Sequence, residues 1–258
     1  MKPVDSGDTT TDAFLGGRVR LLQPRRGHRV GLDAALLQAL VPAETEGLLV
    51  DLGTGVGAIA FSLAARLSHA KVIGVENNPA MIALGRAALD LPENAGFAGR
   101  VTLLEGDVTA RRPERETYGL ADGGACWVLM NPPFAMPDEG RVSPDPHRAA
   151  AHVGDADTLA NWIRTASGLL GQGGRLGIVH RADALPRLLQ ALGQGWGAIA
   201  VIAVHPHADE PANRVLVTAT KGNRAPFRLA PPLVLHESDG RWTEAAGPVL
   251  AGEASLTL

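Results

Sequence analysis

The stretch from Asp51 to Gly57 constrains the fold more than any other part of the sequence. It reads Asp-Leu-Gly-Thr-Gly-Val-Gly and follows Gly47-Leu-Leu-Val50, an apolar run typical of a buried parallel strand. From Val56 to Leu67 the apolar residues recur on one face, which predicts a helix. Glycines allow a sharp turn and a close approach to a ligand, and a helix N-terminus offers unpaired N–H groups. Strand, turn and helix together predict a nucleotide-type binding site.

Two classes of ligand fit this turn. The pattern Gly-x-Gly-x-x-Ala that begins at Gly53 satisfies the dinucleotide fingerprint, so NAD(P) is one candidate. Gly57, together with Asp51 at the strand end, resembles instead the first motif of class I S-adenosylmethionine (SAM) methyltransferases, in which the acid faces the charged amino-acid end of SAM. Glu76 ends the next predicted strand, where a carboxylate can accept both ribose hydroxyls of either ligand. The turn by itself leaves both ligands open.

The composition limits the class of protein. A chain of 258 residues, 45% of them hydrophobic, predicts one globular domain with small appendages. The N-terminus has no apolar signal core, and the longest apolar run, around residues 198–204, is far too short to cross a bilayer. The single cysteine, Cys126, excludes an intramolecular disulfide framework and is expected in a buried strand. We therefore expect a cytoplasmic monomer with no membrane partner.

Two acid-free stretches, residues 13–32 and 211–236, concentrate the basic side chains. Their cations are Arg18, Arg20, Arg25, Arg26, Arg29, Arg214, Lys221, Arg224 and Arg228. A surface that follows phosphates needs such a local concentration, although the net charge is only −3. The alternative is a solvated face in a chain that uses arginine almost exclusively over lysine. Both interpretations remain open on charge alone.

Strands and helices alternate through the rest of the chain. We expect strands at 47–50, 71–76, 101–105, 125–130, 174–180, 197–204 and 214–220 and helices at 32–40, 56–67, from 79, 157–170 and 182–192, after a short strand or hairpin at 14–22. Alternation predicts a parallel sheet with helices on both faces, and the last two strands are too close in sequence to be parallel. The fold class is therefore α/β, with a mostly parallel seven-stranded sheet and a C-terminal antiparallel hairpin, and this arrangement resembles the Rossmann-like fold of class I methyltransferases. We expect an N-terminal extension (1–46), a core (47–222) and a packed tail (223–258).

The segment Asn131-Pro-Pro-Phe134 follows an apolar strand and suits methyl transfer to a planar amine. Such a nitrogen is a poor nucleophile because its lone pair is delocalised. The Asn131 side-chain oxygen and the Pro132 carbonyl can accept its two hydrogens, and they favour the transition state as the nitrogen becomes tetrahedral and positive. Prolines stiffen the loop, and Phe134 offers a face on which a base can stack. A dinucleotide site explains none of this, so the expected cofactor is SAM.

With these motifs the chain resembles the bacterial tRNA(Val) adenine-N6-methyltransferase family, which modifies the adenosine beside the anticodon. The segment Gln23-Pro-x-x-Gly-x-Arg-x-Gly-x-Asp33 resembles the family's sequence ahead of the first motif, and Ser143-Pro-x-x-x-Arg148 to His152 resembles its loop after Asn-Pro-Pro. The similarity covers nearly the whole chain. The departures from the family pattern are Phe134 for tyrosine, His28 for an aromatic residue, Ala151 for arginine and Val153 for glutamate.

The resemblance implies three groups of site residues. Those expected to bind SAM are Asp51, Gly53, Thr54, Gly55, Gly57, Glu76, Asn77, Asp107, Val108 and Asn131, with Asp107 accepting from the adenine amine. Those expected at the reacting amine are Asn131, Pro132 and Phe134. Those expected to hold tRNA, the partner that the family implies, are Arg25, Arg26, Arg29, Pro133, Arg148, His152, Lys221 and Arg224.

Other interpretations share parts of this pattern. Glutamine methyltransferases of release factors also have Asn-Pro-Pro but carry a sizeable helical domain ahead of the core, for which residues 1–46 are too few. DNA adenine methyltransferases usually carry a target-recognition domain, and no insertion here is long enough. Another RNA, a small-molecule amine and a binding module without activity also remain alternatives. His205 and His207 could be a metal pair, but solvated loop histidines are the stronger interpretation, so we expect no metal.

Overall fold

A mixed sheet of nine strands forms the centre of the computed structural model, which describes residues 9–26, 29–133 and 146–256, the side chains of 146–157 excepted. The strands are β3 (Gly47–Leu52), β4 (Ala70–Glu76), β5 (Val101–Glu105), β6 (Ala125–Met130), β7 (Leu170–Arg181), β8 (Trp196–His205), β9 (Arg214–Lys221), β10 (Arg228–Leu229) and β11 (Leu233–Val234). Their spatial order is β10-β8-β9-β7-β6-β3-β4-β5, and β11 also pairs with β8. β3 to β7 are parallel, and β9 is antiparallel to both of its neighbours.

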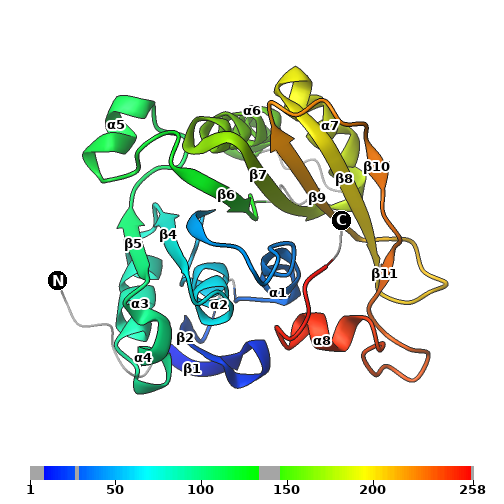
Figure 1. Ribbon diagram of the computed structural model, residues 1–258, viewed down its shortest axis with the longest axis horizontal. Coiled ribbons are helices and arrows are strands. Elements are labelled where there is room, and N and C mark those ends of the chain that lie inside the picture. The colour runs from blue at the N-terminus through cyan, green and yellow to red at the C-terminus, as the bar shows by residue number, and fades with distance from the viewer. Residues whose placement is uncertain (1–8, 27–28, 134–145, 257–258) are drawn as a thin grey trace.

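Helices cover both faces of this sheet (Figure 1). They are α1 (Leu32–Gln38), α2 (Ala58–Arg66), α3 (Pro79–Leu89), α4 (Ala95–Ala98), α5 (Arg112–Thr117), α6 (Pro146–Leu169), α7 (Leu185–Leu192) and α8 (Ala246–Leu250). One hydrophobic core joins the sheet to α1, α2, α3 and α8, and a second core joins the other face to α6 and α7. The expected α/β fold with an antiparallel C-terminal hairpin is therefore confirmed.

The predicted element boundaries agree best where an apolar run is bounded by polar residues. The strands 101–105 and 125–130 are found with those limits. The amphipathic segment 157–170 is the second half of α6, and its predicted apolar face is buried at Leu159, Trp162, Ile163, Ala166 and Leu169. β7 begins at Leu170 rather than at the predicted Gly174. Leu170 pairs with Ala125 and Arg175 pairs with Trp127, so the four polar or glycine residues 171–174 form an irregularity within the strand.

The N-terminal segment forms a hairpin that is longer at both ends than the short strand or hairpin expected at 14–22. β1 (Thr9–Phe14) pairs antiparallel with β2 (Val19–Pro24) across a turn in which Gly16 and Gly17 have φ of 64° and 88°. Left-handed φ values of this kind favour glycine. Val19 and Leu21 of β2 enter the core shared with α2 and α3, so the hairpin packs on that face of the domain.

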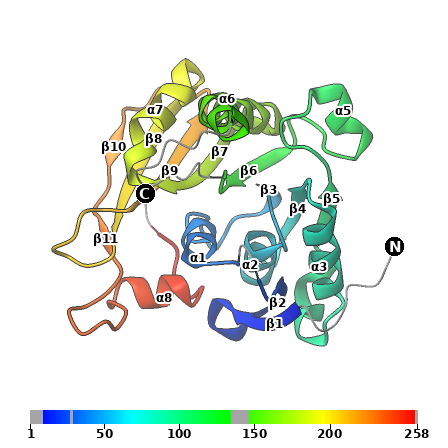
Figure 2. The same ribbon diagram turned by 180° about the vertical axis from the view of Figure 1, so that it is seen from behind.

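The C-terminal tail packs against the core, and two short strands in it extend the predicted seven strands to nine. β10 and β11 run parallel to β8 along its outer edge, and α8 lies beside α1 (Figure 2). The large apolar side chains of the tail differ in burial, and Leu233 and Leu235 are buried. Trp242 is not: it is 49% exposed and stacks on His236 with ring centroids 4.3 Å apart.

The polarity of the strands defines two edges of the sheet. At the carboxyl edge the parallel strands β3 to β7 end, and at the amino edge they begin. Ligands of open α/β sheets bind beyond the carboxyl ends of the strands, so this edge is where a site is expected. Among the described helices, none is long and apolar enough to cross a membrane.

Candidate active site

The glycine turn joins β3 to α2 at the carboxyl edge. Gly53, Gly55 and Gly57 have φ of 71°, 58° and 95°, values that side chains other than glycine rarely adopt. The N–H groups of Gly53 and Thr54 both donate to the Val75 carbonyl at 2.9 Å, which ties the turn to the end of β4. The three glycines predicted to bind SAM are thus required by the backbone of the turn itself.

The three glycines differ in the space around them. A Cβ on Gly53 would lie 2.4 Å from Trp162 Cη2, and one on Gly57 would lie 2.6 Å from Phe61 Cε1. A Cβ on Gly55 would meet nothing within 4 Å. The open side of the turn is therefore at Gly55, where a ligand could approach the backbone. Trp162 lies on the buried face of α6, more than a hundred residues along the chain, so its contact with the turn arises only from the tertiary structure.

Asp51, at the end of β3, is fully buried beneath the turn. Its Oδ2 accepts a hydrogen bond from Thr54 Oγ1 at 2.5 Å, whereas Oδ1 has no hydrogen-bond partner among the residues that the structure describes. Burial raises the pKa of Asp51 from 3.8 to about 7, and the hydrogen bond from Thr54 opposes this rise. A buried acceptor without a donor suits a cationic ligand group such as an ammonium.

The raised pKa of Asp51 predicts a pH-dependent stability. Between pH 4 and 7 the folded protein holds a proton at Asp51 that the unfolded chain releases, so the stability from this group falls as pH rises towards 7. In Asp51→Asn this pH dependence is absent. The free energy of unfolding of the variant, measured relative to that of the parent, should therefore be about 2–3 kcal/mol more favourable at pH 7.5 than at pH 5. Urea unfolding of both proteins at the two pH values measures this, and an equal difference at both would contradict it.

Glu76 and Asp107 follow the next two strands at the same edge. Glu76 Oε2 accepts from the Gly55 N–H at 3.0 Å, and Oε1 accepts from the Asn78 N–H at 2.9 Å. Asn78 Oδ1 in turn caps α3 by accepting from Ala80 N at 3.0 Å. These bonds orient the carboxylate beside the glycine turn. Asn78 is thus the residue that caps α3. Asn77, the predicted SAM ligand, lies between Glu76 and Asn78 and is exposed.

The turn after β5 holds the other expected adenine contacts. Asp107 Oδ1 accepts from Thr109 N at 2.7 Å and from Thr109 Oγ1 at 2.8 Å, and the Asp107 carbonyl accepts from Tyr118 Oη at 2.7 Å. Val108 is buried beside this exposed acid. The Asp107 carboxylate is therefore held in place at the carboxyl edge, one strand beyond Glu76.

Asn131 follows β6, the strand that pairs with β3 on the side away from β4. In the register of the two strands Met130 pairs with Leu52, so Asn131 lies level with Gly53. Its Oδ1 is buried and has no hydrogen-bond partner in the described part of the chain. Pro132 is buried and Pro133 is exposed. Phe134 lies outside the described residues.

The basic residues expected to hold RNA do not all gather at this edge. Asp33, in the first turn of α1, accepts from Arg214 Nε at 3.1 Å, and Arg214 pairs with Arg181 where β7 ends. The start of α1 therefore lies at the carboxyl edge. Arg25 and Arg26 are exposed just before it, and the intervening Arg29 pairs with Asp12 at 2.6 Å. Arg29 Nη1 also donates to the Pro24 carbonyl at 3.4 Å and the Val30 N–H donates to Gln23 Oε1 at 2.7 Å, so the chain next to Arg25 lies near the start of α1.

Lys221 and Arg224 lie at the opposite, amino edge. β9 is antiparallel, so its last residue Lys221 lies level with the start of β6, about 17 Å along the strands from Asn131. The Lys221 Nζ donates to the carbonyls of Ser167 and Leu170 at 2.6 and 2.7 Å, which satisfies the end of α6. Lys221, expected to hold tRNA, thus lies at the edge of the sheet opposite Asn131, and its ammonium group is engaged by the end of α6. Arg148 and His152 lie in α6, but their side chains are outside the described set.

The residues of this edge fit SAM. The open space beside Gly55, the unpartnered Asp51 oxygen and the Glu76 and Asp107 carboxylates supply room and acceptors for the amino group, ribose and adenine amine of SAM. The turn from Asp51 to Gly57 contains no arginine or lysine that would offset the Asp51 and Glu76 charges against a pyrophosphate. Among the described residues no group of histidine, cysteine, aspartate or glutamate could hold a metal ion.

Comparison with known proteins agrees with this geometry. The family model "methyltransferase small domain" matches residues 29–207. The tRNA1(Val) (adenine(37)-N6)-methyltransferase of Porphyromonas gingivalis is 31% identical over 69% of this chain and 68% of its own length. The release factor glutamine methyltransferase of Corynebacterium glutamicum is 31% identical over 69% of this chain and 63% of its own.

A crystal structure from Agrobacterium tumefaciens, described as a predicted O-methyltransferase, is also similar. It is 34% identical and superposes with a TM-score of 0.75, over 87% of this chain and 98% of its own. The family match covers more than half of the chain and includes the glycine turn, Glu76, Asp107 and Asn131. The chain belongs to the methyltransferase small domain family and is a SAM-dependent methyltransferase.

Proposed function

We propose that the protein transfers the methyl group of SAM to the exocyclic N6 of an adenine in tRNA, beside the anticodon of a valine tRNA. The observation that carries the proposal is the buried Oδ1 of Asn131, which has no partner among the described residues and lies on a proline-stiffened loop level with the glycine turn. A buried acceptor without a donor is costly unless a ligand supplies the donor. An exocyclic NH₂ is such a donor.

Two acceptors of this chain would hold the reacting amine. Asn131 Oδ1 and the Pro132 carbonyl would accept its two hydrogens, which would make the nitrogen lone pair less delocalised into the base. Bound SAM supplies an electrophilic methyl group. As positive charge develops on the nitrogen, both hydrogen bonds strengthen, so the acceptors stabilise the transition state more than the bound substrate. The proton leaves after the methyl has arrived, so no general base is required.

An amine is favoured over a hydroxyl as the methyl acceptor. A hydroxyl becomes a good nucleophile only when a base removes its proton, and the amide and carbonyl oxygens at Asn131 and Pro132 are not bases. By this argument the reaction proposed here differs from the O-methyl transfer predicted for the similar Agrobacterium tumefaciens protein. Adenine N6 and a glutamine side-chain amide both fit the acceptors, and relatives named for each of these two activities match the chain. The choice between them depends on the surface around Asn131.

Arg25 and Arg26 favour an RNA substrate, because they are exposed in the chain next to the start of α1, which lies at the edge that carries Asn131. We expect Arg25→Glu with Arg26→Glu to weaken tRNA binding and to reduce the slope of log affinity against log salt by about 2, since each phosphate contact contributes about 0.9. The matched control is Lys71→Glu with Arg164→Glu, two exposed cations away from this edge. Fluorescence anisotropy with labelled tRNA over a salt series measures both. An equal loss of tRNA affinity in the two double variants would indicate a general effect of charge rather than a binding surface at Arg25 and Arg26.

The substrate is tested directly in cells. Mass spectrometry of nucleosides from tRNA of a strain that lacks this protein is expected to show loss of N6-methyladenosine, restored by the parent gene but not by Asn131→Ala. Unchanged tRNA together with loss of a methyl group from a release-factor glutamine would assign the chain to protein methylation instead.

A further inference from the structure

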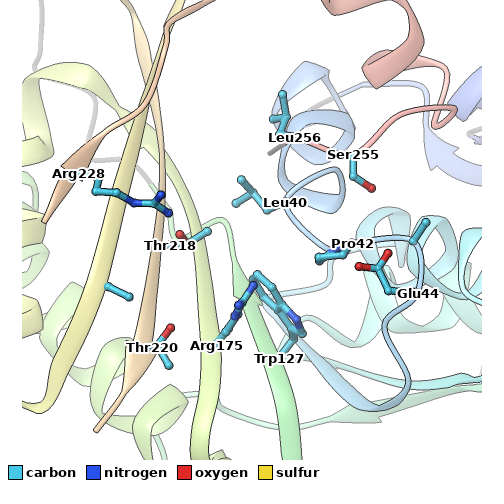
Figure 3. Close-up of a pocket in the computed structure, with 12 residues that line it drawn as sticks. Leu40, Pro42, Glu44, Trp127, Arg175, Thr218, Thr220, Arg228, Ser255 and Leu256 are labelled. Atoms are coloured by element: carbon cyan, nitrogen blue, oxygen red, sulfur yellow. The ribbon is translucent and has the colours of Figure 1, made fainter. Parts of the chain in front are cut away.

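A cavity of about 420 Å³ opens at the amino edge of the sheet, where β6 and β7 begin (Figure 3). Residues from β6, β7, β8 and β9 form its floor, and the loop after α1, β10 and the end of the tail form its walls. The lining side chains that carry chemistry are Glu44, Trp127, Arg175, Thr218, Thr220 and Arg228. Its volume lies within the range of roughly 300–1,000 Å³ typical of small-ligand pockets.

This cavity is separate from the methyl-transfer site. Trp127 precedes Asn131 by four residues in β6, which places them about 13 Å apart along the strand. Trp127 also packs on the face covered by α1 and α8, as does Leu40 of the cavity wall. Neither the glycine turn nor Asn131 lines it.

Two arginines give the cavity its charge. Within the described chain, the guanidinium groups of Arg175 and Arg228 form no ion pair and no hydrogen bond. Arginines elsewhere are mostly engaged; Arg115, for example, pairs with Asp122 at 2.6 Å. Glu44, the one acid among the described residues of the lining, is on the opposite wall from Arg228 (Figure 3). The cavity therefore has a basic side that faces an acidic one.

The basic side is held in position. The Arg175 guanidinium lies over the Trp127 ring, 5.7 Å from its centroid, and Trp127 is itself buried. A cation–π contact fixes one face of a guanidinium and leaves the N–H donors at its rim available to a planar or tetrahedral anion. Arg228 extends across the cavity towards Thr218, whose hydroxyl lies on the same sheet face as that of Thr220 (Figure 3).

We propose that this cavity binds a nucleotide through its phosphate. Arg175, Arg228 and the two threonine hydroxyls supply donors for phosphate oxygens. Glu44, next to Pro42 and the apolar Leu40 and Leu256, supplies an acceptor for an amino group on a flat apolar ring. The ligand is either a free mononucleotide or a nucleotide within RNA. The inference does not depend on the RNA substrate proposed above, because its test measures binding and not methyl transfer.

The test uses the full-length protein saturated with adenosylhomocysteine, which closes the SAM site to competing nucleotides. Calorimetry with AMP is expected to show one site, weakened at least tenfold in Arg175→Gln with Arg228→Gln. Lys71→Gln with Arg164→Gln, two exposed cations outside the cavity, serves as the control pair. Adenosine, which lacks the phosphate, should not compete. Adenosylhomocysteine affinity should be the same in all proteins, which shows that each is folded.

A parallel titration with tRNA separates the two sources of phosphate. AMP binding that depends on the arginine pair, with unchanged tRNA affinity, supports a free mononucleotide. A tRNA affinity reduced at least tenfold in the arginine pair but not in the control pair supports a nucleotide of the RNA, whether or not AMP binds. If the variant with both cavity arginines replaced binds AMP and tRNA as the parent does, the cavity is not a phosphate site. The same conclusion follows if its affinities for both ligands equal those of the control variant.

Discussion

Replacement of Asn131 by alanine is expected to reduce the rate of methyl transfer on the order of 10²–10³-fold, the usual cost of losing one preorganised transition-state contact. The Asn131 oxygen is buried and has no partner in the described chain, so in the proposed mechanism its hydrogen bond forms only with the reacting amine. Asp51, Gly55 and Glu76 are unchanged in this variant, so the affinity for adenosylhomocysteine should remain within about threefold. Single-turnover transfer from labelled SAM, with calorimetry for the cofactor, separates the two effects.

Asn131→Asp provides the matched comparison. It keeps an acceptor oxygen at the same position after β6, so it should retain more activity than the alanine variant. If alanine and asparagine gave the same turnover with tRNA, Asn131 would have no part in the mechanism. If both variants lost adenosylhomocysteine binding, the residue would act through the cofactor instead.

Gly55→Ala is expected to block the cofactor while leaving the protein folded. A Cβ at this position would meet no protein atom within 4 Å. The loss of folding free energy is therefore only that of placing alanine in a left-handed backbone conformation, about 1–2 kcal/mol. The same Cβ would occupy the space where SAM approaches the turn. Overlap of this kind costs about 1–3 kcal/mol, which weakens adenosylhomocysteine binding by roughly 5- to 150-fold. Calorimetry gives the affinity, and thermal unfolding gives the stability.

Gly17→Ala is the control for the backbone cost. Gly17 has φ of 88°, and a Cβ at this position would also meet nothing within 4 Å, but the residue lies in the β1–β2 turn, away from the carboxyl edge. The variant should lose similar stability and bind the cofactor normally. Cofactor affinity equal in Gly55→Ala and Gly17→Ala would show that the open side of the turn does not receive SAM.

The sheet could be predicted from the sequence because its strands are apolar runs between polar or glycine residues. β5 and β6 are found where the pattern places them. The two short strands of the tail could not be foreseen. Arg228 and Leu229 are exposed and carry no strand pattern, and they pair only because β8 offers unpaired backbone groups at its edge. Long-range pairing of this kind leaves no local signal.

The chemistry of the candidate site was also read largely from its residues, but its surroundings were not. Motif spacing identified Asp51 and Asn131, whereas the burial that raises the Asp51 pKa depends on the folded core. Nor could spacing show that Trp162 closes one side of the turn at Gly53. Nor could the acid-free stretch 211–236 show that two of its cations, Arg214 and Lys221 at the two ends of β9, lie at opposite edges of the sheet.

The tail strands also affect how the domain behaves in solution. β10 and β11 occupy Ala200, Val201, Val204 and His205 of β8, and so cap the side of the sheet from which another chain could add a strand. At the far side β5 is only five residues long and exposes Thr102 and Glu105. One edge of the sheet is thus covered by β10 and β11, and the other is short and carries a charged side chain, which disfavours the addition of a strand from another molecule.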